Sequence, residues 1–296
     1  MVFSISCNFK RFLGLLMLDA LIFVICSAFF FIGRSLLFSS ADDSEERGVF
    51  LPVIMYHSVH EGAPQDYVVT PSQLEDDLNW LAENGYSSVT AQELVDYTLG
   101  KGDLPEKPVL ITFDDGFYNN LSLALPLLEK YDMQAIVSIV GKFTNDYAAA
   151  DPHADRYSYL TWEDVAELEN SGRVEIGCHT YNMHSVSGGG RRGCSKIQSE
   201  SEEEYAQILK SDISLVQDEV AEHTGSLPIV FAYPFGCKSR ESVPVLREEG
   251  FLITMLCREA PNYITRDPKC LYDLFRYNRS GCYSTQEFMS MAMSDK

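Results

Sequence analysis

Residues 107–116 of this 296-residue chain read KPVLITFDDG, an apolar run that ends in two carboxylates and a glycine. A short apolar run bounded by turn residues is typical of a strand buried on both faces, as in parallel sheets. In folds built on such sheets, the chemistry gathers at the carboxyl ends of the strands. The sequence therefore predicts a core strand that presents Asp114 and Asp115 at the functional edge of a sheet.

Strand-like and helix-like segments alternate on both sides of this stretch. We expect further strands over residues 49–59, 86–90, 134–141, 174–180, 228–236 and 251–257. Amphipathic segments predict helices over residues 71–85, 91–100, 121–132, 161–172 (with Thr161 as N-cap), 201–224 and 242–250. About seven β/α repeats indicate an α/β fold with a parallel sheet, either barrel-like or doubly wound, and a barrel fits the count better. Residues 187–198 (SGGGRRGCSKIQ) predict a loop.

Residues 12–33 (FLGLLMLDALIFVICSAFFFIG) are apolar enough and long enough to cross a bilayer as a helix. Two basic residues precede this stretch and acidic residues follow it, which favours a cytoplasmic segment over 1–11. We therefore expect a single-pass signal anchor in the cell membrane, a linker over 34–48 and an extracellular catalytic domain over 49–296. A buried core helix is the alternative for the apolar stretch, and cleavage near Ala41 would also export the domain.

The formal net charge of −20 argues against nucleic acid as a partner, because phosphate contacts need clustered Lys and Arg. A neutral or cationic substrate suits an acidic surface better, and we expect a monomeric domain. Six of the eight cysteines lie in the domain, and their irregular spacing matches no zinc motif or compact disulfide scaffold. Their pairing stays open between disulfides and free thiols.

Two groups of residues at predicted strand ends have the chemistry of a metal site. Asp114 and Asp115 are adjacent, so one can bind a cation while the other stays free to accept a proton from water. His179 ends the strand over 174–180, and His184 follows it by five residues, a spacing that a loop must bring together. Two imidazoles and one carboxylate make a facial site for a divalent metal with open positions. A strand-ending turn and two surface histidines are the alternative interpretation.

Two further strand ends could complete such a site. The turn Tyr233–Pro234–Phe235–Gly236 can aim a backbone N–H at a reacting oxygen, although the same residues also form ordinary loops. His57 follows the first predicted strand and would face the same edge of the sheet. A histidine in this position is either a structural residue or a general acid.

TFDDG at 112–116, HTYNMH at 179–184 and YPFG at 233–236 together resemble the polysaccharide deacetylases of the NodB-homology group, carbohydrate esterase family 4. The similarity runs from about Leu51 to Arg279. PVIMYHSV at 52–59 and the five-residue histidine spacing look most like the membrane-anchored branch that contains poly-N-acetylglucosamine deacetylases.

The resemblance implies a distorted (β/α)7 barrel that removes acetyl groups from N-acetylglucosamine-containing polysaccharide, either peptidoglycan or an exopolysaccharide. It also implies a divalent metal, zinc in the first place and nickel, cobalt or iron as alternatives. The implied metal ligands are Asp115, His179 and His184. Asp114 would be the base, the N–H of Phe235 would bind the oxyanion, and the implied substrate contacts are made by Tyr233 and Pro234.

Two departures from the family pattern leave alternatives open. Ala232 stands where many members carry an arginine that orients the catalytic aspartate, so we expect Asp114 to lack that partner. No histidine follows His223, so the late general acid is absent and we expect His57 to take its role. A glycan-binding module with weak or no turnover, or an O-acetyl esterase of the xylan type, would fit the same motifs.

Overall fold

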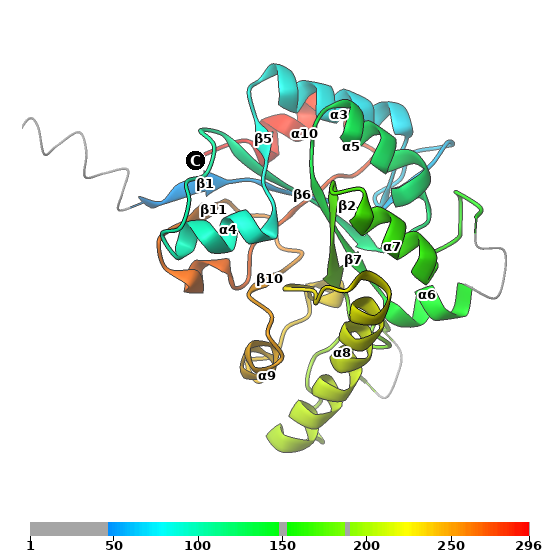
Figure 1. The fold of residues 1–296 in the computed structure, drawn as a ribbon, viewed down its shortest axis with the longest axis vertical. Helices are drawn as coiled ribbons and strands as arrows, with labels where there is room; N and C mark the ends of the chain where they lie inside the picture. Colours follow the sequence, from blue (N-terminus) through cyan, green and yellow to red (C-terminus); the bar gives the residue numbers. More distant parts are fainter. Residues whose placement is uncertain (1–46, 148–152, 187–189, 296) are drawn as a thin grey trace, which may run out of the picture. The chain divides into compact units, whose positions relative to one another are not determined.

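Strand β6 (Pro108–Asp115) lies inside a parallel sheet, as the apolar run predicted. The structure is a computed structural model, and it describes residues 47–147, 153–186 and 190–295. Across the sheet the strands follow the order β10, β9, β8, β7, β6, β2, β12, with β5 added beside β6 (Figure 1). The other strands of this sheet are β2 (Val53–Tyr56), β5 (Ser87–Ser88), β7 (Ala135–Ile139), β8 (Val174–Cys178), β9 (Val230–Ala232), β10 (Ile253–Met255) and β12 (Tyr277–Asn278).

The predicted segments at the N-terminus cannot be compared with this fold. The cytoplasmic segment 1–11, the membrane helix 12–33 and almost all of the linker 34–48 lie outside the described residues. Among the described residues, no helix combines the length and the apolar character that crossing a bilayer requires. Residues Val49–Lys296 form one compact unit, and the fold described below is that of this unit.

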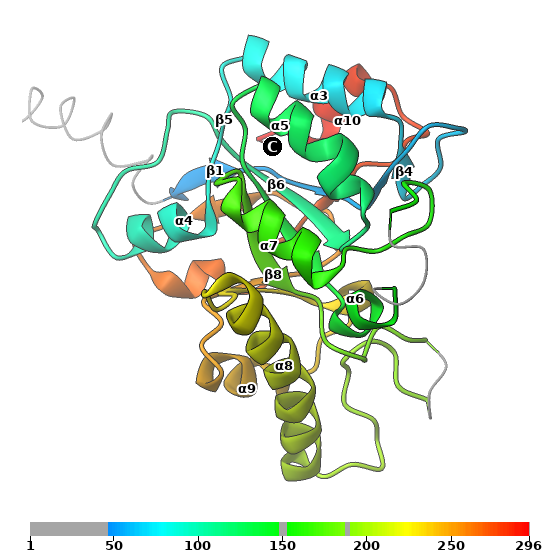
Figure 2. The ribbon, with the colours of Figure 1, turned by 45° about the vertical axis from the view of Figure 1, so that its right-hand side comes forward.

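Helices cover the sheet, and most of them begin at a side chain that caps them. Thr161 accepts a hydrogen bond from the N–H of Asp164 and donates its own N–H to the Asp164 carboxylate, which confirms the predicted N-cap. The same reciprocal pair begins α3, α4, α8 and α10. In Figures 1 and 2, α10 packs beside α3, and α8 packs beside α7 and α9. The helices are α3 (Pro71–Glu83), α4 (Ala91–Thr98), α5 (Leu125–Lys130), α6 (Gly141–Tyr147), α7 (Trp162–Asn170), α8 (Glu202–Thr224), α9 (Ser242–Glu248) and α10 (Thr285–Ala292).

Two predicted elements are divided in the structure. The strand expected over 49–59 becomes β1 (Val49–Leu51), β2 and β3 (Ser58–Val59), with β1 paired to β11 (Asn262–Ile264) and β3 to β4 (Val68–Val69). The helix expected over 121–132 begins as a π-helix, η1 (Asn120–Ala124), and continues as α5. Pro126 lies in the first turn of α5, where a missing N–H costs the helix nothing. Two short 3-10 helices complete the described elements, η2 (Pro234–Gly236) and η3 (Pro268–Leu271).

The C-terminal segment joins the two ends of the sheet. Leu274 forms a parallel bridge to Met255 in β10, and Tyr277 in β12 pairs with Ile54 in β2. The sheet therefore curls toward a barrel, in agreement with the predicted arrangement. Directly after β12, Arg279 forms a buried ion pair with Asp77 in α3 (Arg279 Nε to Asp77 Oδ2, 2.6 Å). Tyr56 and Thr285 donate hydrogen bonds to the same carboxylate, and together these contacts hold the chain in place after the last strand.

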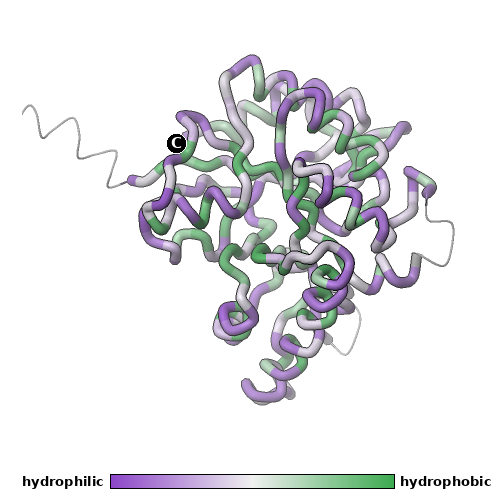
Figure 3. Tube along the Cα trace, viewed as in Figure 1, coloured by the Kyte–Doolittle hydropathy of each residue, from purple (hydrophilic) through white to green (hydrophobic). Residues whose placement is uncertain are grey.

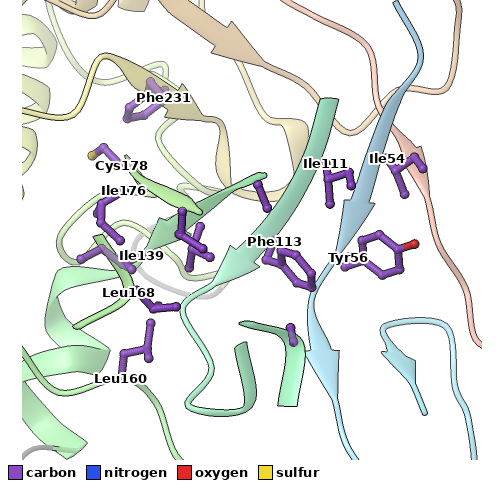
Figure 4. Packing of buried hydrophobic residues seen from close by; sticks show 14 of the residues in the cluster. Ile54, Tyr56, Ile111, Phe113, Ile139, Leu160, Leu168, Ile176, Cys178 and Phe231 are labelled. Atoms are coloured by element: carbon purple, nitrogen blue, oxygen red, sulfur yellow. The ribbon is translucent and has the colours of Figure 1, made fainter. Parts of the chain in front are cut away.

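Successive residues of the central strands face opposite sides of the sheet. Ile54, Ile111 and Phe113 pack in the cluster under the covering helices, part of which Figure 4 shows. Leu110 belongs to a second cluster on the other side. Figure 3 shows that hydrophobic residues follow the central strands, whereas hydrophilic residues are frequent along the outer helices and loops. The period of two then places Asp114 on the same side as Leu110, opposite the side covered by α3, α5, α7 and α8.

Candidate active site

Asp114 and Asp115 end β6, and the backbone turns sharply between them and the following glycine. Asp115 has a φ of 74° and Gly116 a φ of 73°, so the chain leaves the strand through two consecutive left-handed residues. Such a conformation is costly for a residue with a side chain and is found preferentially at functional sites. Its effect here is that the two carboxylates point to different partners, as the sequence predicted.

The Asp114 carboxylate forms a bidentate ion pair with Arg276, which lies directly before β12. Arg276 Nη1 donates to Asp114 Oδ1 and Nη2 donates to Oδ2, both at 2.7 Å, and neither residue is more than 1% exposed. The prediction that Asp114 lacks a basic partner is therefore wrong. The arginine reaches Asp114 from the C-terminal segment, not from β9, because this segment runs between β10 and β2. Ala232, where the family arginine was expected, is fully buried instead.

This ion pair sets the charge of Asp114. Burial alone would raise the pKa of the carboxyl, but the Arg276 guanidinium outweighs burial and holds the pKa below its usual value. Asp114 is therefore ionised at neutral pH, the form that a general base requires. Arg276 occupies one lone pair of each carboxylate oxygen, which leaves other lone pairs free to accept a proton.

Asp115, His179 and His184 come together as the sequence predicted. Asp115 Oδ1 lies 3.6 Å from His179 Nε2 and 3.2 Å from His184 Nε2, and the potential ligand atoms of all three residues lie within 4.8 Å of one another. His179 Nδ1 lies 2.8 Å from the carbonyl oxygen of Ala232. An N–H donated to this carbonyl fixes the tautomer, so that the unprotonated Nε2 faces Asp115.

The loop between the two histidines is held by α8. Asp212 on that helix accepts hydrogen bonds from the backbone N–H groups of Tyr181 (2.7 Å) and Asn182 (2.8 Å). Thr180, with a φ of 70°, turns the chain directly after His179. The five-residue spacing therefore brings both imidazoles to one point because the intervening backbone is anchored at two of its N–H groups. Asp212 was not found by the sequence reasoning, since it lies in a different element and carries no motif.

The properties of these three residues fit a divalent cation. Oδ1 of Asp115 is buried without a hydrogen-bond partner among the described residues, as expected for an atom reserved for a metal. Burial, and secondarily Asp114, raise the pKa of Asp115 to about 7, whereas burial lowers the pKa of His179 to about 3 and also lowers the pKa of His184. The imidazoles are thus neutral, as ligands must be. Tetrahedral zinc ligands lie about 3.3 Å apart, close to the observed separations.

The turn at 233–236 also lies at this site, but only part of it faces the cavity. Phe235 has a φ of 58°, and its ring packs 4.5 Å from the ring of His184. The N–H of Tyr233 donates to Met255 O in β10, and the N–H groups of Gly236 and Cys237 donate to carbonyls within the turn. Because proline has no N–H, the remaining N–H of the motif is that of Phe235, the one predicted to bind an oxyanion.

Tyr233 and Pro234 lie behind the wall of the cavity, contrary to the predicted contact with substrate. Tyr233 is fully buried, and its hydroxyl lies 3.0 Å from the hydroxyl of Ser242 in α9. Pro234 is buried as well and packs against the backbone of Gly193. Alternation along the strand turns the tyrosine toward the helices, so these two residues support Phe235 from behind.

His57 enters the same cavity from the end of β2. The cavity has a volume of about 480 Å³, and its lining includes His57, Asp114, Asp115, His179, His184 and Phe235. Nδ1 of His57 is buried without a hydrogen-bond partner among the described residues, and its ring lies 4.8 Å from the ring of Tyr67. Burial lowers the pKa of His57 to about 4, so the imidazole is neutral in the free protein at neutral pH. The free Nδ1 of an imidazole that lines the same cavity as Asp114 is available for proton transfer.

The cysteines in the described part of the chain form no disulfide. The six cysteines of the described domain are all free thiols, and Cys178 and Cys194 are buried. Burial raises the pKa of the Cys257 thiol, which lines the cavity 3.7 Å from Arg276 Nη2. The thiol is therefore protonated at neutral pH.

A sequence profile described as polysaccharide deacetylase matches residues 101–253, more than half of the chain. The chain belongs to the polysaccharide deacetylase family. The predicted family membership is thereby confirmed. The matched stretch contains both aspartates, both metal-site histidines and the Phe235 turn, whereas His57 and Arg276 lie outside it.

Related deacetylases support the same assignment. The poly-beta-1,6-N-acetyl-D-glucosamine N-deacetylase of Escherichia coli K12 is 27% identical over 217 residues, covering 67% of this chain. This chain covers only 32% of the length of that relative. A solved de-N-acetylase from Aggregatibacter actinomycetemcomitans is 26% identical (TM-score 0.64, 81% of this chain and 99% of that chain). IcaB from Ammonifex degensii is 24% identical (TM-score 0.68, 84% and 99%). The curled parallel sheet predicted from the NodB resemblance is thus confirmed.

Proposed function

We propose that this chain is a metal-dependent N-deacetylase that removes acetyl groups from N-acetylglucosamine-containing polysaccharide. The observation that carries the proposal is the arrangement of Asp114. It is an ionised carboxylate, bound by Arg276 on one side and open on the other to the cavity that contains Asp115, His179 and His184. A base beside a cation site is the pair of groups that hydrolysis of an amide by water needs.

Each group has a role in this reaction. A divalent cation held by Asp115, His179 and His184, zinc in the first place, would polarise the acetyl carbonyl and acidify the attacking water. Asp114 accepts the proton of that water. The N–H of Phe235 donates to the oxygen on which negative charge develops. These residues require no covalent bond between enzyme and substrate.

The departing sugar amine needs a proton, and we assign its delivery to His57. Because burial keeps His57 neutral in the free protein, the imidazole does not enter the reaction as an acid. Negative charge that develops on the carbonyl oxygen would raise the proton affinity of His57 during the reaction. His57 would then take up the proton that Asp114 accepted from the water and pass it to the nitrogen, which returns Asp114 to its ionised form.

We further propose that the enzyme works at the cell envelope as a monomeric domain on a single-pass anchor. The apolar residues 12–33 and the charges that flank them support the anchor and an extracellular domain. Peptidoglycan and a secreted polysaccharide are both substrates that such a location offers.

The test is acetate release by the full chain, purified in detergent, from chitopentaose and from acetylated xylan. We expect release from chitopentaose, loss of activity with a chelator, recovery with zinc, and loss in Asp114→Asn. Preferred release from xylan would indicate an O-acetyl esterase instead.

The proposal fails if the metal-loaded chain binds chitopentaose but releases no acetate, since this is the behaviour of a glycan-binding module. In the same assay, His57→Ala with full turnover would remove the role assigned to that residue. Recovery of activity by His57→Ala with added imidazole would support it.

A further inference from the structure

The cavity that holds the active site carries positive charge, although the chain as a whole carries a net charge of −20. Among the residues that line it, the carboxylates are Asp114 and Asp115. Arg276 neutralises Asp114, and a cation at the predicted metal site would more than neutralise Asp115. Arg156 and Arg192 also line the cavity, and no acidic lining residue offsets them.

These two arginines differ from most other arginines in the described part of the chain. Six arginines lie within 4.0 Å of a carboxylate oxygen: Arg173, Arg191, Arg240, Arg266, Arg276 and Arg279. Arg156 and Arg192 are exposed and form no ion pair with any described residue. In a protein with almost twice as many acidic as basic residues, two guanidinium groups at one cavity without an ionic partner in the described part of the chain are available to a ligand.

Arg192 is held at the cavity by a loop that is built against the Phe235 turn. Its guanidinium lies 5.7 Å from the centre of the Phe235 ring, on the ring face. The next residue, Gly193, has a φ of 54°, and a Cβ there would lie 2.5 Å from the carbonyl oxygen of Pro234. Gly193 also donates its N–H to Ser185 O (2.9 Å). Only glycine allows this close approach, so the segment RRG of the predicted loop has a defined place beside the active site.

Arg156 is positioned by a second anchored turn. The carbonyl oxygen of Asp155, the residue before Arg156, accepts a side-chain N–H from Asn119 (2.7 Å). Oδ1 of Asn119 in turn accepts the N–H of Val59 (2.9 Å). Tyr118 donates its N–H to Ser158 O (2.8 Å). The turn that carries Arg156 is thereby tied to the segment that follows His57 and to the segment that follows β6. The backbone that carries each arginine is therefore held in place by these contacts, while both side chains are exposed.

We propose that Arg156 and Arg192 bind an anionic group on the glycan, close to the N-acetylated sugar that is deacetylated. This inference rests on the proposed function and names the class of its substrate. Guanidinium groups bind carboxylates and phosphates through paired hydrogen bonds, and a neutral glycan offers no such partner. The overall acidity of the chain predicted a neutral or cationic substrate, but a cavity responds to the charges that line it. A uronic acid and a phosphodiester are two sources of the same anionic chemistry.

The experiment compares three probes with the full chain in detergent and zinc. They are chitopentaose, a heparosan pentasaccharide that alternates N-acetylglucosamine with glucuronate, and a glycerol phosphate oligomer substituted with N-acetylglucosamine. We expect kcat/KM to be at least about tenfold higher for one anionic probe than for chitopentaose. Preference for heparosan identifies a carboxylate, and preference for the glycerol phosphate oligomer identifies a phosphodiester.

Variants separate specific recognition from general charge effects. Arg156→Gln and Arg192→Gln should each lower the ratio of anionic to neutral kcat/KM, and the double variant should bring it near one. Arg192→Lys should restore part of the ratio, because lysine keeps the charge but not the paired donors. Lys269→Gln removes an exposed cation that does not line the cavity and should leave the ratio unchanged.

Two results would overturn the inference while leaving the proposed function intact: chitopentaose turned over as well as both anionic probes, or the ratio unchanged in the double variant. Calorimetric titration of Asp114→Asn with the three probes measures in the absence of turnover whether an anionic probe binds more tightly than chitopentaose. If wild type releases no acetate from any probe, the proposed function fails, and tighter binding of an anionic probe that is lost in the double variant still supports the site.

Discussion

Arg276 and Asp114 are 162 positions apart in the chain, yet they form two parallel hydrogen bonds of 2.7 Å inside the protein. The carboxylate belongs to the central strand and the guanidinium to the segment that joins the ends of the sheet. The same contact therefore keeps the Asp114 carboxylate ionised and holds the last strand in place. Loss of either partner leaves the other as a buried, unpaired charge.

Arg276→Met should lower the free energy of unfolding by about 3–5 kcal/mol, because the buried Asp114 carboxylate loses its partner. Without the guanidinium the pKa of Asp114 would rise, so the acidic limb of kcat/KM should move to higher pH. Urea unfolding and a pH–rate profile measure the two effects. Arg258→Ala removes an exposed arginine over the ring of Phe275 and should cost no more than about 1 kcal/mol. A variant Arg276→Met with the wild-type acidic limb would refute the role of Arg276 in ionising Asp114.

Zinc should stabilise the protein through Asp115. At a free zinc concentration of about 100 times Kd, the free energy of unfolding should increase by about 2.7 kcal/mol, because the ion binds the folded state. Asp115→Asn should abolish most of this gain, whereas Asp114→Asn should keep it, since Asp114 is paired with Arg276 and is not a ligand. Thermal unfolding with and without chelator measures the gain. Equal stabilisation of both variants would show that the ion binds elsewhere.

Asp212→Asn should weaken zinc binding by about 10–100-fold, the usual cost of losing a residue that orients metal ligands. An amide oxygen accepts hydrogen bonds from Tyr181 and Asn182 less strongly than a carboxylate, so the loop that carries His184 loosens. Asp218→Asn changes an exposed carboxylate on the same helix and serves as the matched control. Calorimetric titration with zinc gives the affinities, and identical values for the two variants would contradict the role of Asp212.

The metal-free protein should lose stability as the pH falls from 7 to 5, partly because of His57. Its pKa is about 4 in the folded state, below the ordinary value near 6.5, so in this window the unfolded chain binds a proton that the folded protein does not. His57→Gln cannot take up this proton. Its free energy of unfolding should therefore fall by about 2 kcal/mol less than that of wild type between pH 7 and 5. Urea titrations of both proteins at the two pH values measure this difference. If the free energy of unfolding of His57→Gln falls between pH 7 and 5 as much as that of wild type, His57 is not buried as a neutral group.

The features that depend on local sequence could be predicted, and those that depend on the meeting of distant segments could not. Apolar runs and capping residues indicated β6 and the start of α7, because strand burial and helix capping act within a few residues. The motifs also located Asp115, His179 and His184, whose side chains the structure brings together. Arg276 was missed as the partner of Asp114, because its position depends on how the C-terminal segment joins the sheet. In retrospect, a charged residue inside the apolar stretch Leu274–Tyr277 was the available signal.

Tyr233 shows a second limit of motif reasoning. The motif places this residue at the end of a strand, but which side of the sheet its side chain faces depends on the register of β9. The structure turns Tyr233 toward α9 and Phe235 toward the cavity, a choice that the left-handed conformation of Phe235 makes possible.

The C-terminal segment, in which Leu274 pairs with β10 and β12 pairs with β2, has a practical consequence for the design of shortened forms of this protein. Residues 101–253, which carry the family match, omit both His57 and Arg276. A truncated fragment with those limits would retain every proposed zinc ligand, yet its Asp114 would have no counter-ion and the proposed proton donor, His57, would be missing. Expression boundaries for this enzyme therefore have to extend past the last strand, to the α10 helix that packs on α3.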